Sequence, residues 1–221
     1  MVLGKRRYQW FYDHVAHRYY DLLIRWCFGP FGGEDRLREQ LLDPVSFGVG
    51  DQILDMCCGT GGATFAIAAR AGGAANVVGA DLSRSQVRRA AAKGRSGSIH
   101  FAVGDATATG LREGSFDKVF ITHALHEMPR SARLAALAEA RRLLKPGGEL
   151  IVFELDQPPG LALRVFVGLW FFYWLPLNFE TPTRRDMLRR GVANEVREAG
   201  FRTVSKTSVA RGVLQTVVGR K

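Results

Sequence analysis

The fold class of this chain follows from Ile53-Leu54-Asp55-Met56-Cys57-Cys58-Gly59-Thr60-Gly61-Gly62, where an apolar run ends in an acid and breaks into glycines. The apolar run is typical of a buried strand, and the residues after the glycines are typical of a helix. Gly59 and Gly61 can adopt positive φ and carry no side chain, so backbone N–H groups there can approach ligand atoms closely. The stretch therefore predicts an α/β sheet with a ligand at this turn.

The next acid indicates which ligand the turn would face. A dinucleotide site requires a third glycine where this chain has Thr64, so a pyrophosphate is not expected. Asp81 ends the next apolar run, at roughly the twenty-residue interval where a carboxylate meets ribose hydroxyls. The sequence thus predicts a ribose contact without a pyrophosphate contact.

Later motifs make the chain similar to class I S-adenosylmethionine-dependent methyltransferases, whose first motif also joins hydrophobic residues, an acid and G-x-G. The further matches are Gly104-Asp105-Ala106, Ser115-Phe116-Asp117 and Arg142-Leu143-Leu144-Lys145-Pro146-Gly147-Gly148. The resemblance implies that the glycine turn lies under the methionine part of S-adenosylmethionine, that Asp81 holds the ribose diol, and that Asp105 and Ala106 flank adenine. The alternative is a glycine-rich turn without a cofactor, which leaves the three strand-end acids Asp55, Asp81 and Asp105 to be explained separately.

The same resemblance implies a Rossmann-like class I methyltransferase fold, with a seven-stranded, mostly parallel sheet, an antiparallel last strand and helices on both faces. The alternation of short apolar runs with helical patterns agrees with a doubly wound sheet. We expect strands at 53–56, 77–81, 99–103, 118–122 and 150–155. We expect helices at 63–71, 84–92, 131–144, capped by Ser131, and 183–198, ended by Gly200, followed by a hairpin of 203–210 and 213–218.

Length and hydrophobic content fit one domain, since the chain has 221 residues, of which 47% are hydrophobic. We divide residues 1–221 into four parts of a single methyltransferase domain. These are an N-terminal helical cap (1–50), a cofactor-binding core (51–155), an apolar substrate-side insertion (156–182), and the last helix with the C-terminal hairpin (183–221).

The formal net charge of +10 favours an anionic partner, which could be nucleic acid, an acidic lipid surface or an anionic substrate. Nucleic acid is not expected, because neither an N-P-P-Y motif nor a catalytic cysteine follows the fourth strand. Three cysteines without a C-x-x-C pair predict neither a disulfide framework nor a zinc site. A reducing cytosol fits this usage, and the polar N-terminus shows no apolar signal core, so we expect a cytoplasmic protein.

Two segments lie outside the strand–helix repeat, an aromatic and basic one at 8–31 and an apolar one at 161–177. The second contains one charged residue, Arg164, and is shorter than the roughly twenty apolar residues of a membrane-spanning helix. It predicts a buried helix or a membrane-surface element. Insertions at these two places select the substrate in class I methyltransferases, so we interpret 161–177 as an aromatic-rich lid over an apolar substrate, with peripheral contact to the inner face of a membrane. The alternative is that its aromatic residues complete the core.

Methyl transfer from a sulfonium requires alignment and exclusion of water rather than a metal or a covalent intermediate. A phenol-activated carbon or a protonated heteroatom also requires a base whose pKa lies near working pH. The candidate catalytic residues are His123, His126 and Glu127, which follow the fourth strand at the carboxyl edge of the sheet where ligands bind. A structural role is the alternative for each histidine, and His14 and His17 are expected at the surface.

Within this class the chain looks most similar to the ubiquinone and menaquinone C-methyltransferases. Tyr12-x-x-Val15-Ala16-x-x-Tyr19 with Phe28-Gly29 resembles their N-terminal signature. The family typically has arginine and asparagine where this chain has His126 and Glu127, so the acceptor can differ. By resemblance, the S-adenosylmethionine contacts fall on Asp55, Gly59, Thr60, Gly61, Asp81, Leu82, Asp105, Ala106 and Thr122.

The sequence therefore predicts a methyltransferase that converts S-adenosylmethionine to S-adenosylhomocysteine and acts on an apolar small molecule, such as a quinol-type or other lipid-like acceptor. One alternative is N-methylation of a phospholipid head group. Another is a protein that binds S-adenosylmethionine without catalysis. No metal is expected, and the oligomeric state stays open.

Overall fold

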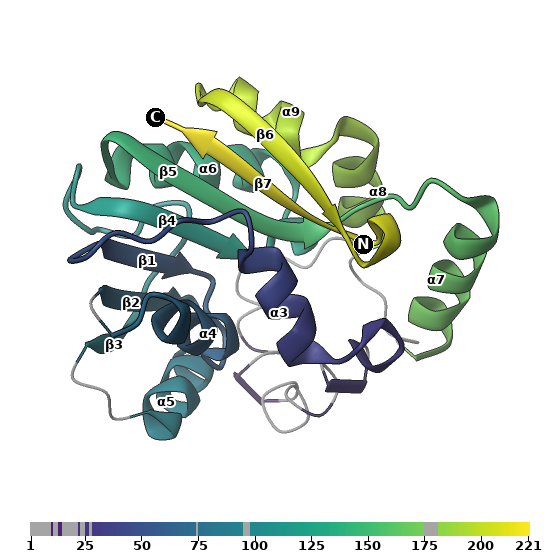
Figure 1. Ribbon diagram of the computed structural model, residues 1–221, viewed down its shortest axis with the longest axis horizontal. Helices are drawn as coiled ribbons and strands as arrows, with labels where there is room; N and C mark the ends of the chain where they lie inside the picture. Colours follow the sequence, from purple (N-terminus) through teal and green to yellow (C-terminus); the bar gives the residue numbers. More distant parts are fainter. Residues whose placement is uncertain are drawn as a thin grey trace.

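The structure is a computed structural model that describes residues 28–73, 75–94, 98–174 and 181–221, together with Trp10, Asp13, His14, Leu22, Arg25 and Trp26 (Figure 1). Its centre is a seven-stranded sheet in the order β3-β2-β1-β4-β5-β7-β6. The strands are β1 (Gln52–Met56), β2 (Asn76–Asp81), β3 (Ile99–Val103), β4 (Phe116–Thr122), β5 (Leu144–Leu155), β6 (Arg202–Val209) and β7 (Leu214–Arg220).

Strands β1 to β5 are parallel, and β7 runs antiparallel between β5 and β6. The predicted fold class is confirmed, including the antiparallel last strand. Because the chain order reverses between β1 and β4, the carboxyl ends of these two neighbouring strands form the crevice in which ligands bind in such sheets.

Two apolar clusters hold helices against opposite faces of the sheet. The first buries α6 (Arg130–Leu143) with α8 (Thr181–Arg190) and α9 (Val192–Glu198). The second buries α3 (Glu34–Leu42) and α4 (Gly62–Arg70), and Figure 1 shows these helices on the other side of the sheet. Helix α5 (Arg84–Lys93) packs against β2 and β3. Both sheet faces are thus covered by helices, as the resemblance to class I methyltransferases implied.

The boundary between α6 and β5 differs from the prediction. The helix begins at Arg130 with Pro129 in the cap position, so Ser131 is not the cap. Strand β5 begins at Leu144, directly after the helix, because Leu144 pairs with Phe116 before the register shifts to Lys118 and Glu149. Pro146, Gly147 and Gly148, which we expected between the helix and the strand, therefore lie inside β5 as an irregularity, where Gly147 has a φ of 78°.

The predicted helix at 183–198 is wrong, because the segment forms two helices. Gly191 separates α8 from α9 with a φ of 81°, a left-handed conformation that a continuous helix cannot contain. The end of the second helix was predicted correctly, since Gly200 follows it with a φ of 88°.

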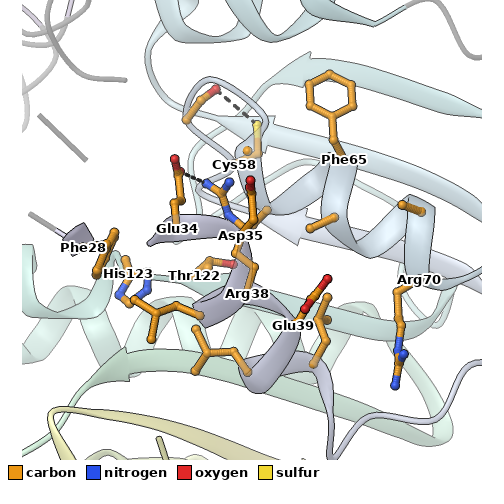
Figure 2. A pocket seen from close by; sticks show the side chains of 18 of the residues that line it. Phe28, Glu34, Asp35, Arg38, Glu39, Cys58, Phe65, Arg70, Thr122 and His123 are labelled. Carbon is orange, nitrogen blue, oxygen red and sulfur yellow. Dashed lines mark hydrogen bonds and ion pairs between the residues drawn. The ribbon is translucent and has the colours of Figure 1, made fainter. Parts of the chain in front are cut away.

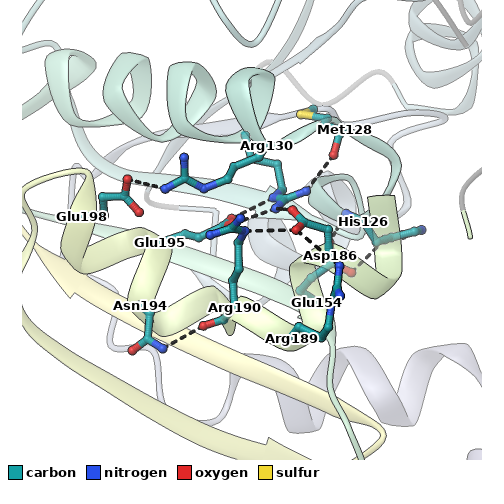
Figure 3. A network of polar contacts seen from close by, with 11 residues as sticks. His126, Met128, Arg130, Glu154, Asp186, Arg189, Arg190, Asn194, Glu195 and Glu198 are labelled. Atoms are coloured by element: carbon teal, nitrogen blue, oxygen red, sulfur yellow. Dashed lines mark hydrogen bonds and ion pairs between the residues drawn. The ribbon is translucent and has the colours of Figure 1, made fainter. Parts of the chain in front are cut away.

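A buried arginine joins the helices of the first cluster (Figure 3). Arg133 is fully buried and donates to Glu195 at 2.7 Å from both Nε and Nη2, to Asp186 at 2.7 Å, and to the carbonyl of Met128 at 2.9 Å. One guanidinium therefore connects α6, α8, α9 and the turn that precedes α6.

Helix α7 (Leu161–Trp174) covers most of the apolar segment predicted as a lid, and Figure 1 places it at the margin of the molecule. Among the described residues, no helix combines the length and the hydropathy required to cross a bilayer. Leu161, Val165 and Leu169 are 76%, 52% and 63% exposed, so the outer side of α7 does not lie in the core. The side chains of 170–174 lie outside the described residues, so the alternative that the aromatic residues complete the core stays a prediction.

Much of the predicted N-terminal signature, together with His17 and Cys27, lies outside the described residues. His14 is exposed, stacks on Trp10 at 5.3 Å between ring centroids and bonds to its carbonyl, as expected for a surface histidine.

Candidate active site

The glycine turn after β1 has the conformation that the sequence predicted. Gly59 and Gly61 have φ values of 54° and 83°. A Cβ at Gly61 would lie 2.9 Å from the ring of Phe65 and 3.1 Å from Ala90, so a side chain would fill the space under the turn. Thr60 is 4% exposed. The turn thus leaves its backbone as the surface that a ligand can approach.

Asp55 lies beneath this turn and is completely buried. Its carboxylate accepts hydrogen bonds from Thr64 Oγ1 at 2.6 Å and from Thr122 Oγ1 at 3.3 Å, which join β1 to α4 and to β4. Burial raises the pKa of Asp55 to about 6. These contacts connect the end of β1 to α4 and to the end of β4, so the observed role of Asp55 is to fix the position of the turn.

Asp81 at the end of β2 approaches the same turn. Its Oδ2 accepts from the Gly59 N–H at 2.9 Å and its Oδ1 from the Ser83 N–H at 2.8 Å, across the intervening Leu82. Burial raises the pKa of Asp81. Asp13 of the N-terminal segment reaches this edge and accepts from the Ser83 hydroxyl at 2.5 Å. The second predicted acid and the glycine turn therefore form one structural unit.

Asp105 lies beyond β3, next to the end of β2, because the Gly104 N–H donates to the Asp81 carbonyl at 2.9 Å. Its Oδ1 accepts from the Thr107 N–H at 3.0 Å and from the Thr107 hydroxyl at 2.8 Å. Ala106 packs against the first apolar cluster. The ends of β1, β2 and β3 therefore carry the three predicted acids along one edge of the sheet.

A cavity of about 980 Å³ opens between this edge and α3 (Figure 2). It is lined by four of the predicted site residues, Gly59, Thr60, Thr122 and His123. The other predicted residues lie outside this lining, namely Asp55, Gly61, Asp81, Leu82, Asp105, Ala106, His126 and Glu127. The cavity thus represents only part of the predicted site.

The wall contributed by α3 was missed by sequence reasoning. Arg38 pairs with Glu34 one turn earlier, and both line the cavity beside Phe28. The Arg38 guanidinium lies directly over Gly62 at the start of α4, where a Cβ would collide with it. Its charge partly opposes the rise that burial causes in the pKa of Asp55, and it adds to the lowering that burial causes in the pKa of His123. The spacing Glu34-x-x-x-Arg38, beside the buried Leu37 and Leu41, is the signal that marks this wall.

The two candidate histidines have different surroundings. Burial lowers the pKa of His123 to about 4, so its imidazole is neutral at physiological pH, and its ring lies 5.4 Å from that of Phe28. A base with such a low pKa takes a proton poorly. Glu127 lies in the 3₁₀ turn η3 (Leu125–Glu127), and its charge contributes to raising the pKa of the buried Cys57 thiol.

His126 is held by a buried carboxylate that the sequence did not predict (Figure 3). Its Nδ1 lies 2.8 Å from Oε1 of Glu154 on β5, and Glu154 Oε2 accepts the Leu125 N–H at 2.9 Å and the His126 N–H at 3.3 Å. Burial opposes ionisation of Glu154, but its histidine neighbours and backbone donors still hold its pKa below the ordinary value. An ionised Glu154 accepts the proton on Nδ1, which makes Nε2 the basic ring nitrogen.

The residues of this edge fit S-adenosylmethionine, since a turn with glycines at positions 59, 61 and 62 and a buried Thr60 side chain lies beside two strand-end carboxylates that suit ribose and adenine. A family model described as a methyltransferase domain matches residues 53–148. The chain is also 32% identical over 205 residues to an uncharacterized methyltransferase of Synechocystis sp., covering 91% of this chain and 90% of that protein. The chain therefore belongs to the class I S-adenosylmethionine-dependent methyltransferases.

Within that class, the chain is 32% identical over 227 residues to a demethylmenaquinone methyltransferase of Beutenbergia cavernae, covering 95% of this chain and 89% of that protein. Its fold is also similar to phosphoethanolamine N-methyltransferase 2 of Haemonchus contortus in complex with S-adenosyl-L-methionine. That similarity has a TM-score of 0.63 and 19% identity, and it covers 91% of this chain and 46% of that chain.

Proposed function

We propose that this methyltransferase transfers the methyl group of S-adenosylmethionine to a ring carbon of a quinol-type or other lipid-like acceptor. The observation that carries this proposal is the 32% identity, over nearly the full length of both chains, to a demethylmenaquinone methyltransferase. Phosphoethanolamine N-methylation is supported only by likeness of fold at 19% identity, so it ranks second.

For the cofactor, we assign the ribose to Asp81 and the adenine edge to Asp105 and Ala106, with Leu82 beside them. The backbone of Gly59, Thr60 and Gly61 would lie under the methionine part, with Asp55 and Thr122 beneath the reacting end. Arg38 adds a cation at the cavity wall, which suits the methionine carboxylate. When bound, S-adenosylmethionine supplies an electrophilic methyl group whose sulfur keeps the electron pair of the broken bond.

For the reaction, we assign the base to His126. Its Nε2 takes the proton of a phenolic hydroxyl, and the ionised Glu154 stabilises the resulting imidazolium. The phenolate directs electron density to the ring carbon, which forms the bond to the methyl group, and the hydrogen of that carbon leaves as a proton. His123 stays neutral and, with Phe28, provides an uncharged wall. Glu127 lies close enough for its negative charge to act on the neighbouring Cys57 thiol.

The test is a product assay with methyl-labelled S-adenosylmethionine and either demethylmenaquinol or phosphoethanolamine. We expect label in the quinone product, and none with Gly61→Val, whose side chain would fill the turn. Label in a methylated phosphobase would favour the second candidate. Binding of S-adenosylmethionine without turnover of any acceptor would instead support a non-catalytic role.

A further inference from the structure

Helix α7 has an apolar inner face and an apolar outer face. Leu163 and Val167 pack against the second apolar cluster, as do Phe28 and Phe31 next to the 3₁₀ turn η2 (Gly29–Phe31). Leu161, Val165 and Leu169 follow one another at four-residue spacing and are 76%, 52% and 63% exposed. Residues four apart lie on one side of a helix, so these three form an outward apolar stripe.

The stripe contains no polar group that would keep it in water. The whole segment of α7 has one charged residue, Arg164, whose Nε donates to the carbonyl of Pro158 at 2.6 Å. Phe166, 45% exposed, adds an aromatic ring to the outer side. An exposed apolar surface of this kind marks an interaction site rather than ordinary solvent-facing helix.

Further exposed apolar side chains precede η2. Leu22 and Trp26 are 67% and 44% exposed, again four residues apart, and the exposed Arg25 lies between them. The η2 turn and α7 both pack on the second cluster, through Phe28 and Phe31 and through Leu163 and Val167. Tryptophan beside arginine is typical of a protein surface at the boundary between lipid and water.

Charge favours a lipid surface with anionic head groups over other occupants. The chain has 31 basic and 21 acidic residues, a net charge of +10, and α7 itself has no acid that such a surface would repel. The helix is too short to span a bilayer, so it would lie in the interface plane.

We propose that the outer face of α7, with Leu22 and Trp26, docks this protein on an anionic bilayer surface. The inner face of the same helix would remain packed on the protein through Leu163 and Val167. The docking rests on the exposed stripe and the charge, and it does not depend on the proposed function.

The experiment is co-sedimentation of the full chain with vesicles of phosphatidylcholine alone or mixed with phosphatidylglycerol. Binding should require phosphatidylglycerol and weaken as salt is raised. The triple variant Leu161→Gln, Val165→Gln, Leu169→Gln should bind at least about tenfold more weakly. Val49→Gln removes an apolar side chain that is 96% exposed, more than any residue of the stripe, and that lies far from α7 in the sequence, so this variant should bind as the unchanged chain does.

Two further readouts separate the outcomes. The triple variant should bind S-adenosylmethionine and methylate a short-chain, water-soluble quinol normally, since its changes lie outside the cofactor edge. Loss of cofactor binding would mean that the triple variant is misfolded. The single variant Leu169→Gln, for which we expect a smaller loss of vesicle binding, would then test the proposal. The proposal would be overturned if the triple variant bound vesicles as strongly as the unchanged chain, or if the unchanged chain did not bind vesicles. It would also be overturned if the unchanged chain formed oligomers in solution that the triple variant does not form.

Discussion

At the scale of single residues, the side chain that organises the proposed base comes from another strand. Glu154 is completely buried on β5, 28 positions after His126, and four hydrogen bonds fix it against the η3 turn and its own neighbour Leu155. A buried carboxylate with its hydrogen bonds satisfied orients an imidazole and favours its charged form. Glu154 is thus a positioning residue for His126.

Replacing Glu154 should therefore change the pH dependence of turnover as well as its size. His126→Asn should lower kcat by about 10² or more, the ordinary contribution of a general base, with cofactor affinity unchanged. Glu154→Gln should lower kcat and move the acidic limb of the kcat profile to lower pH, because the imidazolium loses its anion. Steady-state rates against pH measure both effects.

Two controls accompany this pair. Glu149→Gln alters a carboxylate on the same strand that pairs with Lys118 at 3.0 Å, and it should leave the acidic limb in place. The double variant should be little worse than His126→Asn alone, since the two side chains act together. Additive losses without a shifted limb would assign Glu154 a purely structural role.

Asp81 allows a separate test of the cofactor edge. Asp81→Asn should weaken S-adenosylmethionine binding by about 1 to 3 kcal/mol, as expected when hydrogen bonds to a charged group are lost. Isothermal calorimetry gives the affinity. Asp117→Asn is the matched control, because Asp117 also accepts a backbone N–H, from Gln52 at 2.9 Å, at the opposite end of the strands. Equal affinities for S-adenosylmethionine in the unchanged chain, Asp81→Asn and Asp117→Asn would mean that another residue holds the ribose.

At the scale of elements, Arg133 carries the contact between α6 and the α8–α9 pair. Arg133→Met would leave Glu195, 1% exposed, without its partner, which should cost about 3 to 5 kcal/mol of unfolding free energy. Arg130, on the same helix as Arg133, forms a more exposed ion pair with Glu198 of α9, and Arg130→Met should cost at most about 1 kcal/mol. Urea denaturation gives the free energy of unfolding of both variants. Similar losses in the two would mean that the buried contacts of Arg133 stabilise the protein no more than the exposed ion pair does.

The elements also show where local sequence patterns are sufficient. The β1 and β2 strands and the glycine turn were predictable because apolar periodicity, an acid and glycines all lie within a few residues of one another. The cap of α6 was not, since Ser131 looks like a cap whereas Pro129 takes that position. The break at Gly191 was also missed, because one glycine inside an otherwise helical pattern is often tolerated.

At the scale of the molecule, two buried groups should give opposite pH dependences of stability. Asp55 has its pKa raised from 3.8 to about 6, so its contribution is full at low pH and is lost as pH rises through about 6. His123 has its pKa lowered from 6.5 to about 4, so its contribution is full above pH 6.5 and is lost as pH falls through about 4. Each change corresponds to about 3 kcal/mol.

The contributions of Asp55 and His123 to the free energy of unfolding change with pH in opposite directions, so they should nearly cancel between about pH 4 and pH 6.5 in the unchanged chain. His123→Asn should then become more stable, relative to the unchanged chain, as pH falls across this window. Asp55→Asn should show the reverse trend. Denaturant titrations at several pH values measure the differences, and parallel curves for all three proteins would contradict the burial of these groups.

The candidate site was predictable only in part, because local sequence patterns do not encode contacts between distant segments. Its cofactor edge follows from motifs that a strand and its turn place together. The spacing Glu34-x-x-x-Arg38 indicates an ion pair on one face of α3, but only tertiary packing brings this wall to the site. The same holds for the carboxylate of Glu154 on β5. The acceptor-side chemistry thus depends on contacts between residues far apart in the chain.

The position of β7 affects how this protein can be made. Residues 214–220 lie between β5 and β6, so the sheet has a gap there until those residues have been synthesised. While the nascent chain is still attached to the ribosome, the exposed edge of β5 offers unpaired backbone groups to any other strand. The speed at which residues 214–220 are translated, and chaperones that act before β7 is added to the sheet, should therefore affect the yield of folded enzyme.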